Sequence, residues 1–526
     1  MKKMKKIFAL LIAMVMVLGM STSVFAADPT TGSIEITSPK TDPNADNTYY
    51  DAYKILDMTT TGATNDAGDY TAVAYTINSA WTGFFATGAA GAGYIVDTNT
   101  GNLNEITVDG VKKYINITDS NVAEFAKAAF KYAQDNNIAP TTTQTVAKGA
   151  ESVKFENLAL GYYMVYPRGA SVQSGDYTSI VSISNTAPNG KVAQKAEWPG
   201  ITKTADDISV EVGQKVTYTL SSKVPDTTGY TKKYEMTFAD TTTAGLTFDG
   251  VDSIVVKIGS ATLTKDTDYT VSTETADFSV TIDMLTGEEG SKTAKYTYND
   301  PITVTYTATV NDQAVTKIDE NHATLTYHNN PKDDTSKETT PPVVVKTFSA
   351  KVVIKKVDGS DKTTPLEGAK FVLRAKTIGQ AEGDTHESDR AAGKYYYYDA
   401  TAKDVKWVTV TSEKAEDLAK DTTITVVTTD AQGNANFDGL ENGTYELIEV
   451  EAPAGYNLLT TPTEVTVAGS DADATTLTIT TPVENNSGTQ LPSTGGIGTT
   501  IFYIIGAILV IGAGVVLVTR RRMNVN

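Results

Sequence analysis

The sequence of 526 residues contains no cysteine and only three histidines. Without cysteine, disulfides, thiolate metal sites and a cysteine nucleophile are excluded, so an exported chain of this length must be stabilised by other means. His322, His328 and His386 are not spaced as zinc ligands, and no serine nucleophile lies beside them. No glycine-rich phosphate loop is present either. The sequence therefore predicts no metal and no cofactor.

Basic residues are also scarce, with 44 Lys and Arg against 63 Asp and Glu. Four lysines within residues 2–6 precede an apolar stretch from Ile7 to about Met20, and Val24-Phe25-Ala26 supplies the small residues that a signal peptidase needs. This pattern predicts a signal peptide at residues 1–26, cleaved after Ala26, and hence an exported protein.

The opposite end of the chain has the order of a surface-anchoring signal. Leu491-Pro492-Ser493-Thr494-Gly495 is followed by an uncharged run from Thr499 to Thr519 and then by Arg520-Arg521-Arg522. The run gives about 31 Å of helix, enough for one bilayer crossing, and the arginines hold its end on the cytoplasmic side. The whole segment, residues 488–526, resembles the sorting signal of Gram-positive surface proteins, in which a sortase cleaves between threonine and glycine. The alternative is an ordinary tail anchor with a chance pentapeptide.

Removal of both ends takes away four lysines, three arginines and no acidic residue, which leaves 37 basic and 63 acidic residues and a formal charge of −26. A charge of this sign makes nucleic acid an improbable partner.

The remaining residues are rich in threonine, valine and tyrosine. Alternating stretches such as 215–220 and 303–308 are typical of half-buried strands in sandwiches. Clusters of proline, charge and asparagine divide the chain into three domains, 27–197, 198–345 and 346–487. Only Asn121 to Asn136 has a helical pattern, with Val122, Phe125, Ala129 and Tyr132 on one face. We predict an all-β protein with this one helix packed on the first sandwich.

The third domain contains Tyr445-Glu446-Leu447-Ile448-Glu449-Val450-Glu451-Ala452-Pro453-Ala454-Gly455-Tyr456. This segment resembles the E-box of pilin domains of the collagen-adhesin B (CnaB) type. In that family, a buried neutral acid catalyses an isopeptide bond between a lysine on the first strand and an asparagine on the last. The resemblance implies Glu449 as the acid, Lys356 as the amine and Asn485 as the acceptor, with Asn486 as the second choice. Lys355 is expected to face solvent. The alternative is an ordinary ion pair between Lys356 and Glu449.

The chemistry requires these three residue types. Burial lowers the pKa of a lysine and raises that of a carboxylic acid, so a neutral amine can attack the carboxamide while the acid moves protons and ammonia leaves.

The middle domain repeats this logic in another order. Ile201-Thr202-Lys203 opens it, a Phe-x-Asp strand ends at Asp240, and Asn321-His322-Ala323-Thr324-Leu325-Thr326-Tyr327 closes it. The pattern resembles the collagen-adhesin A (CnaA) type domain of pilins, which implies Lys203, Asp240 and Asn321 as a second triad. No comparable triad is evident in the first domain, which we leave uncrosslinked.

Pilus subunits also need a lysine that accepts the sortase acyl group. The family pattern Val-x-Tyr-Pro-Lys is present only as Met164-Val165-Tyr166-Pro167-Arg168, and a guanidinium that stays protonated cannot be the acceptor. Lys195, at the domain junction, is our candidate, with Lys191 second.

Taken together, the chain resembles a major backbone pilin of Gram-positive bacteria. The resemblance implies three tandem immunoglobulin-like sandwiches in a rod, and a structural shaft subunit that sortase polymerises and anchors to the cell wall through Thr494. It implies sortase, other pilin subunits and peptidoglycan as partners, allows host surface ligands, and makes the chain no enzyme apart from its own crosslinking. A singly displayed adhesin or minor pilin is the alternative, and an exported hydrolase lacks a catalytic constellation.

Overall fold

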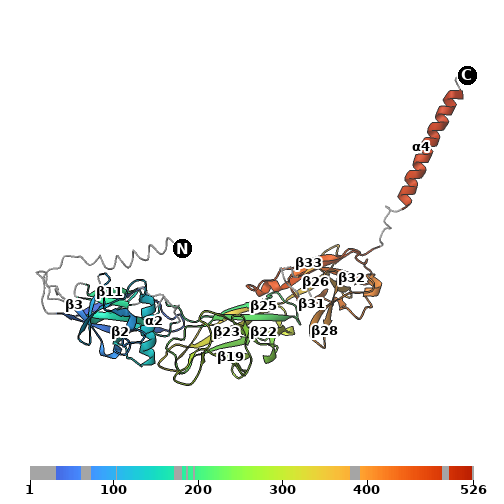
Figure 1. Ribbon diagram of the computed structural model, residues 1–526. Helices are drawn as coiled ribbons and strands as arrows, with labels where there is room; N and C mark the ends of the chain where they lie inside the picture. Colours follow the sequence, from blue (N-terminus) through green and yellow to red (C-terminus); the bar gives the residue numbers. More distant parts are fainter. Residues whose placement is uncertain are drawn as a thin grey trace. The chain divides into compact units, whose positions relative to one another are not determined.

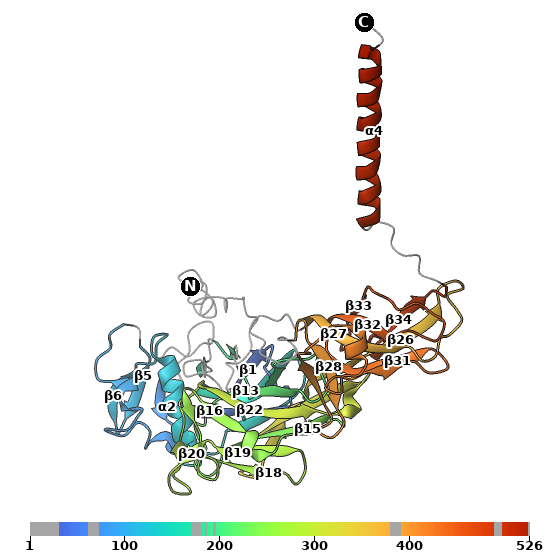
Figure 2. The same cartoon turned by 90° about the vertical axis from the view of Figure 1, so that its right-hand side faces the viewer.

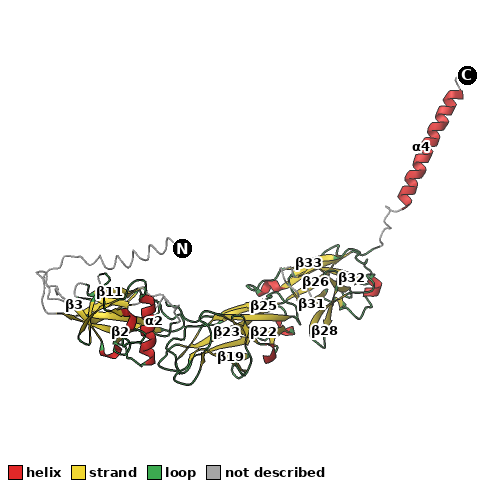
Figure 3. Ribbon diagram, in the orientation of Figure 1, coloured by secondary structure: helices red, strands yellow, loops and turns green. Residues whose placement is uncertain are grey.

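The computed structural model describes residues 31–60, 73–101, 103–170, 180–184, 187–192, 196–378, 391–488 and 497–523. Strands dominate each folded region (Figure 3), which confirms the all-β class. The signal peptide, Lys195, His386 and Leu491 to Gly495 lie outside the described residues.

The N-terminal region is built on two sheets. The β1 sheet has the order β11 (Asn189–Val192), β1 (Thr31–Thr37), β8 (Ser152–Ala159). The β2 sheet has the order β10 (Ile180–Ile183), β9 (Gly161–Pro167), β2 (Asn47–Thr60), β3 (Val73–Ile77), β5 (Glu105–Val108), β6 (Val111–Ile115), β4 (Ile95–Val96), with β7 (Thr142–Ala147) beside β2. Inward residues such as Ile34 and Phe155 from one sheet and Tyr50 and Tyr163 from the other form a buried core.

The expected helix is α2, Val122–Asp135. It buries Phe125, Ala129 and Phe130 in a second core beside the β2 sheet, and the Phe130 ring stacks on Tyr166 of β9 with a centroid distance of 3.9 Å. Because small and aromatic side chains share one face of the helix, burial of that face fixes it on the sheet. The prediction of a helix packed on the first sandwich is confirmed.

The middle region is a sandwich of two further sheets (Figure 1). The β13 sheet has the order β12 (Thr202–Ala205), β13 (Lys215–Lys223), β22 (Pro301–Val310), β16 (Val255–Ile258), β17 (Ala261–Thr262), with β15 (Leu246–Phe248) beside β22. The β14 sheet has the order β18 (Tyr269–Ser272), β19 (Phe278–Asp283), β14 (Glu235–Thr242), β23 (Ile318–His328), β24 (Lys337–Thr339), with β25 (Val343–Phe348) beside β23. A short hairpin joins β20 (Leu285–Thr286) to β21 (Thr293–Ala294). Strict alternation of buried residues along β14, β22 and β23 places every second side chain between the sheets.

The C-terminal region has the same two-layer plan. The β26 sheet has the order β31 (Asn434–Leu440), β26 (Ala350–Asp358), β34 (Thr478–Asn485), and β26 and β34 run parallel. The β27 sheet has the order β29 (Asp404–Val408), β28 (Tyr395–Asp399), β27 (Lys370–Ile378), β32 (Gly443–Glu451), β33 (Thr463–Val467), with β30 (Val427–Thr428) beside β27. Val352, Ile354, Phe371 and Leu447 belong to the core between them.

The short helical turns lie in connections. They are η1 (Ser79–Trp81), η2 (Ala92–Tyr94), η3 (Val251–Ser253), η4 (Asp312–Ala314), α3 (Ala415–Leu418) and η6 (Ala474–Leu477).

Contacts divide the chain into two compact units. The first contains residues 1–208, 215–309 and 319–346, and the second contains 209–214, 310–318 and 347–526. Within the first unit, the Tyr327 hydroxyl of the middle region donates to the buried Asp42 carboxyl of the N-terminal region. Within the second unit, Val212 is part of the core that the C-terminal sheets enclose. The division into domains 27–197, 198–345 and 346–487 stays a prediction.

The last described element is the helix α4, Ile497–Met523 (Figure 2). Within the described residues, its stretch Tyr503–Arg521 is the one helix long and apolar enough to cross a membrane, with a mean hydropathy of 2.1. The apolar run of the sequence is therefore helical, as expected.

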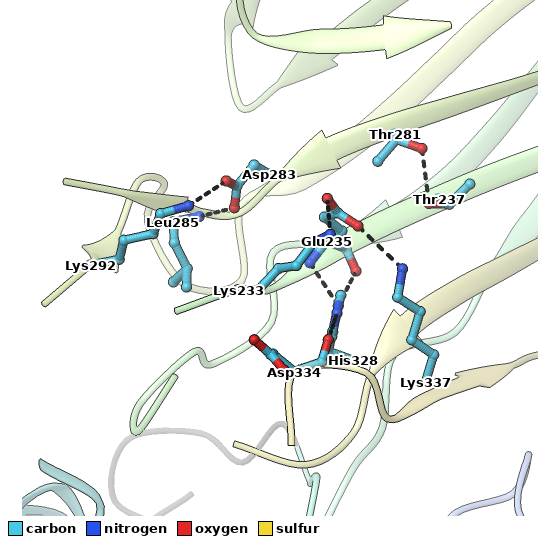
Figure 4. Close-up of polar contacts among 10 residues, drawn as sticks. All are labelled: Lys233, Glu235, Thr237, Thr281, Asp283, Leu285, Lys292, His328, Asp334 and Lys337. Atoms are coloured by element: carbon cyan, nitrogen blue, oxygen red, sulfur yellow. Dashed lines mark hydrogen bonds and ion pairs between the residues drawn. The ribbon is translucent and has the colours of Figure 1, made fainter. Parts of the chain in front are cut away.

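The buried His328, at the end of β23, hydrogen-bonds to Glu235 at the start of β14 (Figure 4). His328 Nδ1 accepts from the Glu235 backbone N–H at 2.9 Å, and Nε2 donates to the Asp334 carbonyl oxygen at 2.9 Å. Glu235 is paired with Lys233 and Lys337. A proton on Nδ1 would face the Glu235 N–H, and burial lowers the pKa of His328. The imidazole is therefore held neutral.

We expect acid to destabilise the middle region through this residue. Because the pKa of His328 is lower in the folded than in the unfolded chain, its stabilisation is present above about pH 6.5 and is lost as the pH falls below that value. His328→Gln should reduce the loss of unfolding free energy between pH 7 and pH 5 by roughly 1 kcal/mol. Thermal unfolding at both pH values measures this. His322→Gln, which replaces an imidazole at a strand position with a side chain 37% exposed, is the matched control. Equal pH dependence in the two variants would contradict the assignment.

Candidate crosslinking sites

The middle sandwich brings Lys203, Asp240 and Asn321 together between its sheets. Lys203 comes from β12 of the β13 sheet, and the other two residues come from the adjacent strands β14 and β23 of the β14 sheet. Lys203 Nζ lies 2.6 Å from Asp240 Oδ2 and 2.5 Å from Asn321 Oδ1. The lysine and aspartate side chains are both 0% exposed. The amine therefore lies next to the carboxamide carbon that it would have to attack.

Aromatic rings close this site from water. Tyr218 and Tyr306 present their rings to Lys203, with centroids 5.3 and 5.7 Å from Nζ. The Tyr306 hydroxyl accepts a hydrogen bond of 2.9 Å from Asn321 Nδ2. Sequence reasoning missed Tyr306, although its inward position in the alternating strand β22 was a usable signal.

Burial perturbs both ionisable members of this triad. It lowers the pKa of Lys203 to about 8, against the opposing effect of the Asp240 charge. Burial also raises the pKa of Asp240, although the lysine beside it acts in the other direction. At pH 7 a pKa of about 8 leaves roughly a tenth of the Lys203 amines neutral. Both shifts favour the neutral forms of the lysine and the aspartate.

The C-terminal sandwich assembles Lys356, Glu449 and Asn485 in a different arrangement. Lys356 and Asn485 lie on the adjacent parallel strands β26 and β34, and Glu449 reaches them from β32 of the opposite sheet. Lys356 Nζ donates to Asn485 Oδ1 and lies 3.3 Å from Glu449 Oε1. Asn485 Nδ2 donates to both carboxyl oxygens of Glu449, at 3.0 and 2.9 Å.

This second site is also buried, since the Lys356 and Glu449 side chains are both 0% exposed. Burial lowers the pKa of Lys356. The neighbours behave differently, because Lys355 Nζ donates to the Gln432 carbonyl at the surface and Asn486 is exposed. Lys356 and Asn485 therefore meet at the buried site, whereas Lys355 and Asn486 do not.

The N-terminal region contains the same residue types without the same environment. Lys54 Nζ lies 2.6 Å from Asp57 Oδ1, and Asn78 Nδ2 donates to Asp57 Oδ2 at 3.1 Å. The carboxyl group stands between the amine and the amide, and its side chain is 34% exposed. The desolvation that the reaction needs is missing, so the absence of a crosslink in this domain stays our prediction.

Arg168, which stands where the family pattern has the acceptor lysine, forms an ion pair with a buried carboxylate. Its guanidinium donates to both carboxyl oxygens of the buried Asp51, at 3.1 and 2.7 Å. Of the two acceptor candidates, Lys191 lies on β11 with a side chain 62% exposed and Nζ 3.7 Å from a Glu35 carboxyl oxygen. Lys195 lies outside the described residues.

No group of three or more His, Cys, Asp or Glu side chains in the described part of the chain could hold a metal ion.

Three family models match successive parts of the chain. The Gram-positive pilin backbone subunit 2, Cna-B-like domain, matches residues 212–331, the prealbumin-like fold domain SpaA matches 350–482, and the LPXTG cell wall anchor motif matches 483–525. The description of the first model assigns the B class to the middle region, whereas the motif order resembled the A class. The first of these models covers Asp240 and the second covers Glu449, whereas Lys203 and Asn485 lie just beyond their ends.

Named proteins of similar sequence agree with these matches. The chain is 27% identical over 429 residues to the fimbrial subunit type 1 of Actinomyces viscosus, covering 73% of this chain and 78% of that protein. It is 27% identical over 402 residues to the trypsin-resistant surface T6 protein of Streptococcus pyogenes serotype M6, covering 65% and 73%. A solved structure of the group B streptococcus pilus 2b backbone protein is 28% identical, with a TM-score of 0.41, and the match covers 55% of this chain and 99% of that one.

The pair of Arg168 and Asp51 predicts a large effect on stability. Arg168→Ala would leave a carboxylate that is 4% exposed without its cation, and we expect the unfolding free energy of the N-terminal region to fall by about 2 to 3 kcal/mol. Thermal or urea unfolding measures the change. Lys131→Ala removes an exposed i,i+4 pair on α2 and should change stability by less than about 0.5 kcal/mol. Similar losses in the two variants would rule out a structural role for Arg168.

Proposed function

We propose that this chain, which belongs to the backbone pilins of Gram-positive bacteria, is a shaft subunit that two internal isopeptide bonds reinforce and sortase joins to its neighbours. The pilin and anchor matches and the fimbrial relative make the chain a structural subunit of a cell-wall-anchored surface pilus. The crosslinks, their residues and the intersubunit bond are the finer parts of the proposal.

One observation carries the crosslinks. In both sandwiches a buried lysine amine hydrogen-bonds the oxygen of a buried asparagine carboxamide while a carboxyl group touches the same amine. An ordinary buried ion pair would need only the lysine and the acid. In both sites an asparagine carboxamide, which is an electrophile, lies within reach of the lysine amine.

The reaction follows from this geometry. The neutral lysine amine attacks the asparagine Cγ, the amine nitrogen loses one proton, the amide nitrogen gains one and leaves as ammonia, and an amide bond joins the two side chains. No cofactor or oxidant is required. The buried carboxyl group supplies the proton transfers, and exclusion of water keeps the amine nucleophilic.

The bonds would reinforce the fold in place of disulfides. The bond from Lys203 to Asn321 would join residues that are 118 positions apart in the sequence, and the bond from Lys356 to Asn485 would join residues that are 129 positions apart. By analogy with disulfides, constraint of the unfolded chain by loops of this size stabilises a domain by about 5 kcal/mol. Lys356 and Asn485 also lie near the two ends of their domain, on neighbouring strands. A pulling force would therefore pass through the bond and not through the sheet.

Polymerisation uses a second, intermolecular amide. Sortase would cleave between Thr494 and Gly495 and transfer the Thr494 carboxyl group to Lys195 of the next subunit, with Lys191 as the second choice. The last subunit would be transferred to peptidoglycan. Host surface ligands are compatible with this function and no residue is assigned to them.

Intact mass spectrometry tests the internal bonds. The mature wild-type chain should weigh less than its sequence mass by two ammonia molecules. Asp240→Asn and Glu449→Gln preserve side-chain shape but remove the acid, so each variant should lack one ammonia loss and unfold at a lower temperature.

Glu446→Gln is the matched control for these variants. Glu446 lies on the same strand as Glu449 but pairs with Arg374 at the surface, so both bonds should form. A wild-type chain at full sequence mass would end the crosslink proposal.

The polymer has a separate test in cells that produce the chain with its sortase. Lys195→Arg keeps the charge but removes the acceptor amine, and we expect the ladder of high-mass species on denaturing gels to disappear. Lys191→Arg should leave it intact. A ladder that persists in Lys195→Arg and is lost in Lys191→Arg would transfer the role to Lys191. A wild-type chain without any ladder would favour a singly displayed surface protein.

A further inference from the structure

We propose that Tyr306 is a catalytic residue of the middle-domain crosslink, and that its phenol hands a proton to the departing amide nitrogen of Asn321. The inference rests on the crosslinking reaction proposed above and adds a residue that the lysine, acid and asparagine pattern does not contain.

In the middle site, Tyr306 supplies a hydroxyl group at the nitrogen that must leave, where the described structure has no hydrogen bond to the acid. Asp240 Oδ2 lies 2.6 Å from the Lys203 amine, whereas Oδ1 of the same carboxyl group is buried and has no hydrogen-bond partner in the described structure. Asn321 Nδ2, the nitrogen that must leave, is 2.9 Å from the Tyr306 hydroxyl. The Asp240 carboxyl group thus contacts the Lys203 amine, and the Tyr306 hydroxyl contacts the leaving nitrogen of Asn321.

The C-terminal site supplies the comparison. There, Glu449 reaches the leaving nitrogen of Asn485 directly, with both carboxyl oxygens within 3.0 Å. Aspartate is one methylene shorter than glutamate, and in the middle site the acid and the asparagine share one sheet whereas the lysine comes from the other. Tyr306 lies on the lysine's sheet, in β22, and its hydroxyl contacts the leaving nitrogen of Asn321 from there.

The surroundings keep the Tyr306 hydroxyl protonated and oriented. Burial, together with the negative charge of Asp240, raises the pKa of Tyr306. The ring stacks on Tyr218 at 5.6 Å and meets the edge of Phe278 at 4.6 Å. A fixed phenol beside a carboxyl group is a suitable proton carrier.

The proton count closes without any further reactant. The reacting state has neutral Lys203 and protonated Asp240. As the Nζ–Cγ bond forms, Asp240 Oδ2 takes a proton from Nζ, Oδ1 gives its proton to the Tyr306 oxygen, and the phenol gives its own proton to Nδ2. The Cγ–Nδ2 bond breaks and ammonia leaves. Nδ2 accepts this proton because the nitrogen loses its amide conjugation when Cγ becomes tetrahedral. Asp240 and Tyr306 end in the protonation states in which they began.

Tyr306→Phe in the full chain tests the proposal, with the rate of ammonia loss from freshly synthesised protein followed by intact mass and peptide mapping. We expect the bond from Lys203 to Asn321 to form at least about 100-fold more slowly. The bond from Lys356 to Asn485 in the same molecule should form at the wild-type rate, which makes it an internal control. Tyr269→Phe is the matched control, since Tyr269 pairs with Ile282 of β19 whereas Asp240 pairs with Phe278 at the opposite end of that strand, so both bonds should form at the wild-type rate.

The outcomes separate this proposal from the crosslinking proposal. A wild-type chain without ammonia loss would overturn both. Two ammonia losses in wild type and an unchanged rate in Tyr306→Phe would overturn the role of Tyr306 alone.

A second measurement covers the case in which Tyr306→Phe does not fold. Fluorinated tyrosines at position 306 retain the ring and the hydroxyl while making the phenol more acidic. A rate for the middle bond that varies through the fluorinated series supports proton transfer. A constant rate would show that Tyr306 only holds Asn321 in place, which would overturn the proposal.

Discussion

The structure depends on placing a lysine amine in a dry sandwich core beside a carboxyl group and a carboxamide. Burial of a lone ammonium costs several kcal/mol, and an ion pair offsets that cost only in part. Two such pairs would be weak sources of stability if they stayed ionic. The proposed conversion to amides would remove both charges from the core and leave a neutral covalent bond in place of each ion pair.

The two sites take their three residues from different combinations of strands. In the C-terminal sandwich, amine and acceptor lie on adjacent parallel strands and the acid faces them from the opposite sheet. In the middle sandwich, acid and acceptor lie on adjacent antiparallel strands and the amine faces them. The shared requirement is that three inward positions meet at one point between the layers. Strand alternation makes this possible from either sheet.

Much of this could be predicted from the sequence, because period-two alternation and the E-box fix which side chains point inward. Glu449 and Lys356 follow from alternation on single strands. The same alternation points Tyr306 inward, but its contact with Asn321 crosses from one sheet to the other, and no local pattern encodes such a contact. The role of Arg168 was likewise visible only as a departure from a motif, and the fold explains it through Asp51. The grouping of residues 209–214 with the C-terminal region also comes from long-range contacts.

The proposed covalent reinforcement would also account for an exported chain without cysteine, since the bonds would form from lysine and asparagine and would need no oxidant. The measurement that tests this account most directly is tandem mass spectrometry of a protease digest of the mature protein. We predict branched peptides that join Lys203 to Asn321 and Lys356 to Asn485. Linear, unmodified peptides containing these four residues, with no branched species, would contradict it.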